Sequence, residues 1–203
     1  NRLKYFILGA GSNILVDDLG FNGLMIHTNK LNPTLKFDQK TLTVGASVLV
    51  IKLLRLCMQN GIRGFDFLAG IPGNMGGVFF MNGGTKIGSA SDKLANLTVF
   101  DLASKQTRTI SKDQMNYSYR TQSFLSTNEI IYEGTFALKE APSQEAAVEV
   151  QDQIQKLLKA RKDSQPIDRP SCGSVFKNPD EKSGQFSWKL IDQAGLRGTQ
   201  IGD

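Results

Sequence analysis

A glycine-rich stretch, LAGIPGNMGGVFFMNGG at residues 68–84, constrains this chain more than any other feature. Six of the 20 glycines lie in it, and glycine permits positive φ and a close approach of the backbone to a ligand. Backbone N–H groups presented in this way hold phosphate without a cationic side chain. Because the residues between the glycines are large and apolar, we expect a phosphate-binding loop fixed against a core. A bulged apolar strand without a ligand is the alternative.

The composition is that of an ordinary globular protein. The 203 residues, 40% hydrophobic and 21% charged, are enough for one large domain or two small ones. No apolar run is long enough for a transmembrane helix, and we expect a cytoplasmic protein. The net charge of +5 comes from scattered Lys and Arg residues, which suit small anionic ligands as well as nucleic acid. His27 is the only histidine, and Cys57 and Cys172 lack metal-ligand spacing, so we expect no metal site and no disulfide.

Apolar runs separated by turn residues predict a mixed α and β protein. Strands are expected at residues 5–8 and 23–28, on either side of a glycine-rich turn, and a hairpin at residues 35–44. Ser47 is expected to cap a helix that ends at Gly61. An antiparallel set of strands is expected further on, at residues 97–102, 107–110 and 130–138.

The last third of the chain is predicted to hold two helices. Pro142 and Ser143 begin a long helix to about Lys162, whose early Glu residues and late Lys and Arg residues match the helix dipole. A short unit with a second helix near residues 188–194 follows. We therefore place a domain boundary near residue 141.

The segment GAGSNILV at residues 9–16 follows a predicted strand, as a dinucleotide-binding fingerprint does. Ile14 occupies the place of the third glycine of G-x-G-x-x-G, and the residues after it make a poor helix, so we reject a Rossmann unit. Ser12 and Asn13 still offer a hydroxyl and an amide to a pyrophosphate oxygen. Taken alone, the segment fits an ordinary turn between strands equally well.

Two further motifs carry groups suited to catalysis. In SCGSVFKNP, residues 171–179, Ser174 supplies a hydroxyl, Lys177 a cation and Asn178 an amide. A capped loop bounded by proline is the structural alternative, and a Ser–His–Asp triad is excluded because no histidine is nearby. In YSYR, Arg120 follows two aromatic residues. It is suited either to a structural ion pair or to holding a carboxylate.

Four motifs in chain order resemble those of the UDP-N-acetylenolpyruvoylglucosamine reductases, the MurB family: GAGSNILVDDLGFNG, AGIPGNMGGVFFMNGG, YSYRTQSF and PSCGSVFKNP. The resemblance spans nearly the whole chain. It implies an α+β FAD-binding fold of the vanillyl-alcohol-oxidase/PCMH-like type, in which two α+β subdomains hold FAD without a Rossmann fold. A small α+β substrate-binding domain follows them. We accordingly expect an incomplete first FAD subdomain at residues 1–35, a second at 36–141, and a linker helix with an incomplete substrate-binding domain at 142–203.

The resemblance also implies the ligands and the residues that bind them. FAD, with NADPH as the hydride donor, is expected at the two glycine-rich loops, held by Gly9, Gly11, Ser12, Asn13, Gly73, Gly76, Gly77 and Asn82. The expected reaction is reduction of UDP-N-acetylglucosamine enolpyruvate to UDP-N-acetylmuramate, in peptidoglycan precursor synthesis. Ser174 matches the family's general acid and Arg120 the arginine that holds the substrate carboxylate. Lys177 and Asn178 match positions that bind the UDP-sugar.

Three departures from the family leave alternatives open. Cys172 stands where a small residue such as alanine is usual. The family's N-terminal segment and its C-terminal catalytic glutamate have no counterpart among these residues, so we expect the chain to be truncated at both ends. The alternatives are another FAD-dependent oxidoreductase of the same superfamily and a catalytically incomplete nucleotide-binding fragment. We expect small-molecule partners, no nucleic acid and no membrane. The sequence implies no protein partner.

Overall fold

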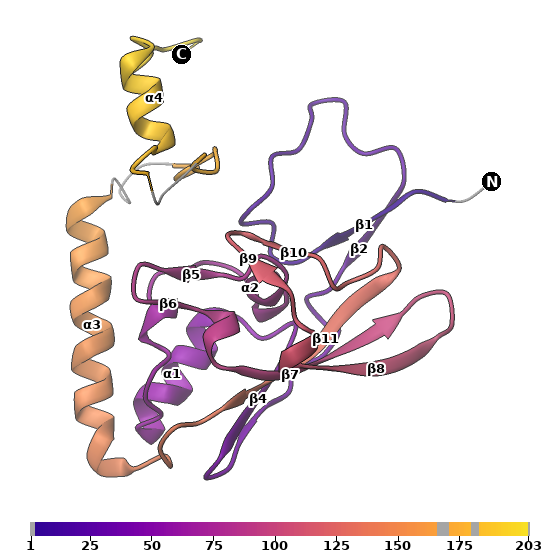
Figure 1. The fold of residues 1–203 in the computed structure, drawn as a ribbon, viewed down its shortest axis with the longest axis vertical. Coiled ribbons are helices and arrows are strands. Elements are labelled where there is room, and N and C mark those ends of the chain that lie inside the picture. Colours follow the sequence, from indigo (N-terminus) through magenta and orange to yellow (C-terminus); the bar gives the residue numbers. More distant parts are fainter. Residues whose placement is uncertain (1–2, 166–170, 180–182, 203) are drawn as a thin grey trace. The chain divides into compact units, whose positions relative to one another are not determined.

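The computed structural model describes residues 3–165, 171–179 and 183–202. It forms two compact units, Asn1–Ser164, here the N-terminal unit, and Gln165–Asp203, here the C-terminal unit (Figure 1). Among the described residues, all named strands and the helices α1 to α3 belong to the N-terminal unit. No helix in the described part of the chain is both long and apolar enough to cross a lipid bilayer.

A five-stranded antiparallel sheet lies at the centre of the N-terminal unit. Its strand order is β3-β4-β11-β7-β8, from β3 (Leu35–Phe37), β4 (Thr41–Gly45), β7 (Leu94–Asp101), β8 (Gln106–Ser111) and β11 (Glu129–Ala137). Leu42 pairs with Phe136 across β4 and β11, and both side chains are fully buried. The hairpin predicted at residues 35–44 and the predicted antiparallel set are confirmed.

Short elements connect the larger ones. Two-residue strands pair as β5 (Gly84–Thr85) with β6 (Gly88–Ser89), and as β9 (Tyr117–Ser118) with β10 (Thr121–Gln122). Single 3₁₀ turns lie at Asp66–Leu68, Ala90–Asp92, Lys112–Gln114 and Gln144–Ala146. Two of these turns begin with reciprocal capping boxes, Ser89 with Asp92 and Ser111 with Gln114. These side chains satisfy backbone N–H groups that would otherwise lack partners.

Helix α1, Val50–Asn60, buries one apolar face in the core, formed by Val50, Leu53, Leu54 and Cys57. The three-to-four spacing of these residues is that of a helix facing a core. Burial raises the pKa of the Cys57 thiol, which is therefore a core residue rather than a nucleophile. The helix ends, as predicted, at Gly61, which has a φ of 60° and donates its N–H to the carbonyl oxygen of Cys57.

The prediction that Ser47 caps α1 is wrong. The N-cap is Leu49, which makes no side-chain capping bond. Ser47 lies in a turn closed by the bond from the Val48 N–H to the Gly45 carbonyl oxygen. Met75 and Gly76 hold this turn by donating their N–H groups to the carbonyl oxygens of Val48 and Ala46. The Ser47 side chain is buried there, two residues before the cap.

The glycine-rich stretch contains a short helix, α2, at Met75–Phe80. Met75, Val78 and Phe79 are buried, and the Phe79 ring packs against Phe136 with centroids 5.7 Å apart. This apolar face holds the helix against the sheet even though Gly76 and Gly77 have a low helix propensity. The alternative of a bulged strand is therefore wrong. The three-residue spacing of Met75 and Val78 is the pattern that favours a helix.

Helix α3, Ala147–Ser164, belongs to the N-terminal unit. It packs along α1 with Val150 and Ile154 buried, and Arg63 binds Glu149 at 2.7 Å and Glu140 at 2.9 Å. The predicted long helix is confirmed, with its acidic first turn and basic last turn. Because α3 covers α1, the compact unit extends beyond residue 141 to Ser164. The limits of the three expected domains stay a prediction.

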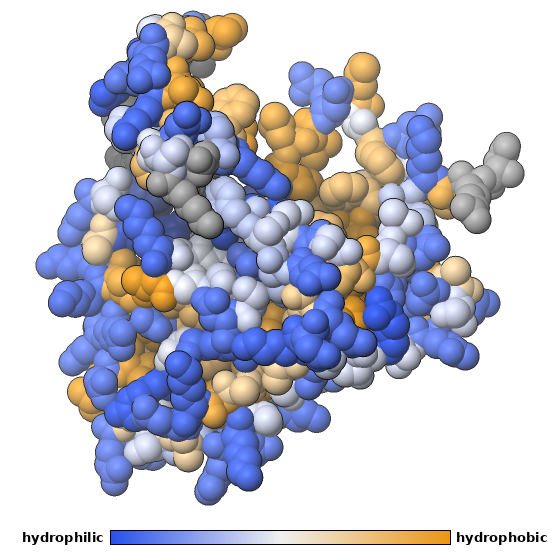
Figure 2. Space-filling model, viewed as in Figure 1, coloured by the Kyte–Doolittle hydropathy of each residue, from blue (hydrophilic) through white to orange (hydrophobic). Residues whose placement is uncertain are grey.

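Two parallel strands, β1 (Tyr5–Leu8) and β2 (Leu24–His27), form a separate two-stranded sheet. Residues 9–23, all of which the structure describes, connect them without a helix. A Rossmann unit would require a helix in this connection, so its rejection is confirmed. Apolar side chains of the connection remain exposed, Leu15 to 91% and Leu19 to 97%, and Figure 2 shows hydrophobic side chains gathered over this segment.

Candidate functional site

The two glycine-rich loops lie against each other in the N-terminal unit. The Ser12 hydroxyl donates to the carbonyl oxygen of Pro72 at 3.3 Å, although 60 residues separate them in the sequence. Gly73 has a φ of 104°, and a Cβ at this position would lie 2.6 Å from the Ser12 Oγ. Only glycine permits this approach. Residues 9–13 and 70–77 therefore border one common surface.

The other predicted cofactor-binding glycines differ in their surroundings. A Cβ on Gly9 or Gly77 would meet no atom within 4 Å, and on Gly11 it would meet only Leu8, at 4.0 Å. Gly76 instead packs on Ala46 and donates its N–H to the Ala46 carbonyl oxygen at 2.9 Å. That N–H is already bonded within the chain. The open positions are Gly9, Gly11 and Gly77, and Asn13, two residues after Gly11, is exposed.

Among the described residues, two buried side-chain oxygens have no hydrogen-bond partner, Ser47 Oγ and Asn74 Oδ1. They belong to the two segments that meet at the start of α2, where residues 46–48 bond to residues 75 and 76. Asn74 is the N-cap of α2 but makes no side-chain capping bond. Leaving a buried polar atom unpaired costs roughly 1–3 kcal/mol. A ligand that donates hydrogen bonds would satisfy such oxygens.

Arg120 lies next to the end of the glycine-rich stretch. Its Nη1 donates to the carbonyl oxygen of Asn82 at 3.3 Å and its Nη2 to that of Gly84 at 2.9 Å. The guanidinium is 5.6 Å from the centre of the Tyr119 ring. Asn82 in turn accepts the N–H of Ser91 on its Oδ1 at 3.0 Å. The structure thus brings together Arg120 and Asn82, which were predicted separately as substrate and cofactor contacts.

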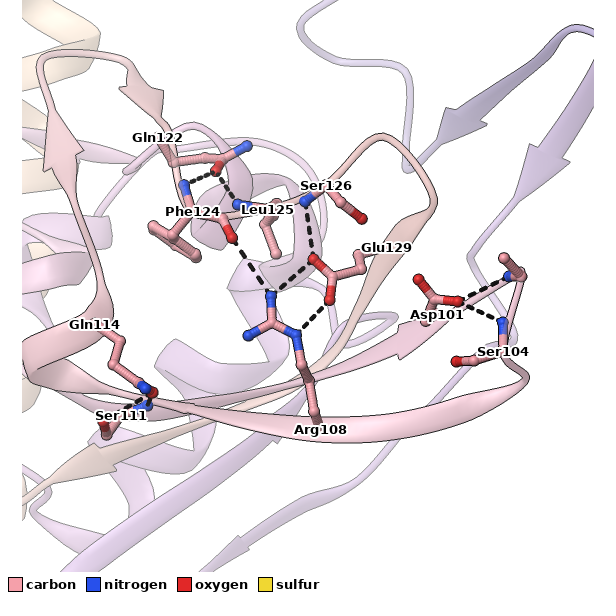
Figure 3. A network of polar contacts seen from close by, with 11 residues as sticks. Asp101, Ser104, Arg108, Ser111, Gln114, Gln122, Phe124, Leu125, Ser126 and Glu129 are labelled. Atoms are coloured by element: carbon pink, nitrogen blue, oxygen red, sulfur yellow. Dashed lines mark hydrogen bonds and ion pairs between the residues drawn. The ribbon is translucent and has the colours of Figure 1, made fainter.

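A polar network fixes the segment that follows Arg120 (Figure 3). Glu129, whose side chain is only 5% exposed, forms an ion pair with Arg108 and accepts the Ser126 N–H at 2.8 Å. Arg108 Nη2 lies 2.9 Å from Glu129 Oε2 and also contacts the Phe124 carbonyl oxygen at 3.4 Å. Gln122 Oε1 accepts the N–H groups of two residues further on, Phe124 and Leu125. The segment that connects the Arg120 turn to β11 is therefore held in place by hydrogen bonds at Phe124, Leu125 and Ser126.

We expect the Glu129 network to make the stability of the N-terminal unit depend on pH. The Arg108 hydrogen bond holds the pKa of Glu129 below its ordinary value of 4.5. The unfolded state therefore binds the proton more readily. The contribution of Glu129 is complete above pH 4.5 and is lost as the pH falls through the folded-state pKa.

Urea denaturation of the wild type and of Glu129→Gln checks this expectation. At pH 7 the variant should lose roughly 2 kcal/mol. The difference should shrink as the pH falls below 4.5. A difference that stays constant down to pH 3 would contradict the ionic role of Glu129.

The predicted catalytic and UDP-sugar residues of the C-terminal unit lie on the segment before helix α4, Ser187–Gln193. Ser174 and Lys177 are exposed. Asn178 Oδ1 accepts the Ser187 N–H at 3.0 Å, and the Ser187 hydroxyl donates to the Lys177 carbonyl oxygen at 2.7 Å. The motif is thus anchored to α4, and the predicted second helix is confirmed. Ser174 belongs to the C-terminal unit and Arg120 to the N-terminal unit.

Two further features bear on the ligands of the chain. Among the described residues, no group of three or more His, Cys, Asp or Glu side chains lies close enough to hold a metal ion. In the last turn of α3, the Arg161 side chain lies over the backbone of Gly70, where a Cβ would come within 2.5 Å of the Arg161 Cδ. The end of α3 therefore borders the second glycine-rich loop.

Comparison with known families agrees with a non-Rossmann cofactor fold. Residues 1–110 match a family model described as "FAD binding domain". The N-terminal unit thus has the sequence character of an FAD-binding domain. Residues 165–203 match a second model, described as "UDP-N-acetylenolpyruvoylglucosamine reductase, C-terminal domain". The chain belongs to the UDP-N-acetylenolpyruvoylglucosamine reductase (MurB) family.

Individual relatives give the same assignment. The chain is 36% identical over all of its residues to a UDP-N-acetylenolpyruvoylglucosamine reductase of Clostridium tetani, and 37% identical over 199 residues to one of Halalkalibacterium halodurans. It spans 63% and 64% of the lengths of these two relatives. The crystal structure of MurB from Thermus caldophilus superimposes with a TM-score of 0.78 at 31% identity, covering 100% of this chain and 70% of that one.

Proposed function

We propose that the chain carries the FAD-binding and substrate-binding parts of a UDP-N-acetylenolpyruvoylglucosamine reductase. Its substrates would be NADPH and UDP-N-acetylglucosamine enolpyruvate, and its product UDP-N-acetylmuramate. The observation that carries the proposal is the contact of the two glycine-rich loops at Ser12 and Gly73. Membership of the family supplies the chemistry. A cytoplasmic location and a role in peptidoglycan precursor synthesis follow from the same proposal.

The residues at the two loops fit a flavin nucleotide. Gly9, Gly11 and Gly77 leave room for a ligand to approach the backbone, as a pyrophosphate requires. Ser47 Oγ and Asn74 Oδ1 are buried without partners, and flavin nucleotides carry hydroxyl and N–H donors that such oxygens accept. The exposed turn at residues 9–13 supplies the Ser12 hydroxyl and the Asn13 amide. These groups bind the nucleotide without a net positive charge.

In this proposal each catalytic side chain has one task. When bound, FAD supplies hydride chemistry between NADPH and the enolpyruvyl methylene carbon. Arg120 uses two N–H groups on Asn82 and Gly84, and a guanidinium has five. The remaining three can hold the substrate carboxylate as negative charge develops beside it. Ser174 donates a proton to the carbon next to the carboxylate, and Lys177 and Asn178 bind the UDP-sugar.

The absorption spectrum of the purified chain tests the proposal directly. The expected result is that flavin bands stay with the chain after FAD is added and unbound FAD is removed by gel filtration, bleach when NADPH is added, and return with UDP-N-acetylglucosamine enolpyruvate. A chain that retains no flavin after gel filtration would overturn the proposal. Flavin that bleaches but is not reoxidised would leave FAD binding intact and exclude the substrate.

Replacing Gly77 with alanine is expected to weaken FAD binding at least tenfold without loss of stability. A Cβ there meets no atom of the chain within 4 Å, and alanine is the better helix former by roughly 1 kcal/mol. The methyl group would instead occupy space proposed for the cofactor. Flavin fluorescence titration measures the affinity, and a thermal melt of the FAD-free variant is the control. Unchanged affinity would show that Gly77 does not face the cofactor.

A further inference from the structure

Two residues with an unfavourable backbone conformation contact each other at the proposed substrate arginine. Among the described residues that are not glycine, three have a positive φ, namely Asn82 (45°), Lys105 (60°) and Arg120 (54°). Lys105 lies in the turn between β7 and β8. Asn82 and Arg120 are joined by the bond from Arg120 Nη1 to the Asn82 carbonyl oxygen. A left-handed backbone is disfavoured for a residue with a Cβ, so neighbouring contacts must hold Arg120 in place.

The position of Arg120 is set first by the hairpin that carries it. In the β9–β10 pair, Ser118 pairs with Thr121 and Tyr117 with Gln122. Arg120 is therefore one of the two turn residues at the tip. A hairpin this short fixes no side chain by itself, because two-residue strands supply few backbone bonds. Its base must be attached elsewhere.

Tyr117 supplies that attachment. Its hydroxyl donates to the carbonyl oxygen of Phe79, near the end of α2, at 2.7 Å. Its ring stands edge-on to Phe124, with centroids 4.9 Å apart. Burial raises the pKa of Tyr117, so the hydroxyl remains a donor throughout the neutral range. The last carbonyl groups of a helix need partners from outside it, and Tyr117 provides one to α2.

The β9–β10 hairpin is thus hydrogen-bonded to the glycine-rich stretch at two places. Tyr117 holds Phe79 at the end of α2, and Arg120 holds Asn82 and Gly84 just beyond it. Phe124, against which Tyr117 packs, is itself held by Gln122 and Arg108 (Figure 3). Loss of the Tyr117 hydroxyl would remove the bond to Phe79. Of these two attachments, only the bonds from Arg120 to Asn82 and Gly84 would then hold the left-handed turn.

We propose that Tyr117 is a positioning residue for Arg120, which acts by tying the β9–β10 hairpin to the end of α2. The proposal rests on the proposed function, in which Arg120 holds the substrate carboxylate. Tyr117 does not touch the substrate. Three N–H groups of Arg120 make no bond within the described part of the chain. Tyr117 keeps them oriented in one direction, so that the arginine is preorganised before the substrate binds.

Tyr117→Phe tests the proposal, with Tyr5→Phe as the matched control. The Tyr5 hydroxyl also donates to a backbone carbonyl oxygen, that of Thr127, at 2.7 Å, but Tyr5 lies in β1 and is not part of the β9–β10 hairpin. In the FAD-bound protein, Tyr117→Phe should slow reoxidation of reduced flavin by UDP-N-acetylglucosamine enolpyruvate roughly tenfold. Reduction by NADPH should change less than twofold, and Tyr5→Phe should change neither rate.

A second measurement does not require activity. In the ¹⁵N-labelled chain without FAD, the Arg120 Nη–H signals, identified by their loss in Arg120→Lys, report on the bonds to Asn82 and Gly84. They should exchange with water about tenfold faster in Tyr117→Phe than in Tyr5→Phe. An unchanged signal, or an equal slowing of both half-reactions, would overturn the proposal. If the wild type shows neither half-reaction, the proposed function fails, and the Arg120 signal still decides whether Tyr117 holds the arginine.

Discussion

Replacing Ser174 with alanine is expected to slow reoxidation of reduced flavin by UDP-N-acetylglucosamine enolpyruvate by roughly 10²- to 10⁴-fold, the usual contribution of a general acid. Reduction of flavin by NADPH should stay nearly unchanged, because that step needs no proton from Ser174. Ser174 is exposed in the C-terminal unit, so the loss of its hydroxyl should not disturb folding. Stopped-flow absorbance separates the two half-reactions and reports each rate on its own.

Ser171→Ala is the control for loop geometry. The Ser171 Oγ accepts the Gly173 N–H at 3.2 Å, so this variant loosens the same loop and keeps the Ser174 hydroxyl. We expect it to change either rate by only a few-fold. If Ser171→Ala and Ser174→Ala slow reoxidation equally, the loop rather than the Ser174 proton limits the reaction. An equal loss in both half-reactions of Ser174→Ala would exclude the proton-donor role.

Gly61→Ala is expected to destabilise the N-terminal unit by roughly 3–5 kcal/mol, a loss at the extreme of single substitutions. Two effects add at this position. Gly61 has a left-handed φ of 60°, and a Cβ would lie 1.8 Å from the carbonyl oxygen of Ser143. Ser143 immediately precedes the turn that leads into α3. The substitution would therefore force α1 and the start of α3 apart.

Gly20→Ala separates the two effects. Gly20 has a φ of 74° but no atom within 4 Å of a Cβ, so it should lose only about 1 kcal/mol, from the backbone alone. Urea denaturation followed by far-ultraviolet circular dichroism suits both variants. Fluorescence of Trp188, the only tryptophan, would report on the C-terminal unit instead. Equal losses in the two variants would mean that the contact with Ser143 relaxes at no cost.

The parts of the fold that follow from local pattern were predictable. Helices α1 and α3 and the antiparallel strands have clear apolar periodicity, and Gly61 marks the end of α1. Helix α2 was missed because two glycines interrupt it. What holds α2 is the packing of Met75, Val78 and Phe79 on distant strands, which local propensity does not include. The same reason explains Ser47, whose segment is fixed by bonds to residues 75 and 76.

Part of the candidate site could likewise be predicted from the sequence, and part of it could not. Clustered glycines and polar residues predicted both loops from the sequence alone, and the YSYR motif predicted Arg120; their roles at the site stay predictions. No sequence pattern indicated the unpaired Asn74 Oδ1, the left-handed backbone of Arg120 or the bond from Tyr117 to Phe79. Each depends on residues that are distant in the chain or on a backbone angle. An asparagine flanked by glycine and methionine is too common a pattern to mark a buried, unpaired oxygen.

The contact of Arg161 with Gly70 links the last turn of α3 to the glycine-rich stretch. Arg161 lies in the last turn of α3, which ends at Ser164, and borders the second glycine-rich loop. Gly70 lies two residues before Pro72, whose carbonyl oxygen accepts the Ser12 hydroxyl of the first loop. One short stretch of backbone therefore joins the end of α3 to the contact between the two loops. A shift of the last turn of α3 would move that contact as well.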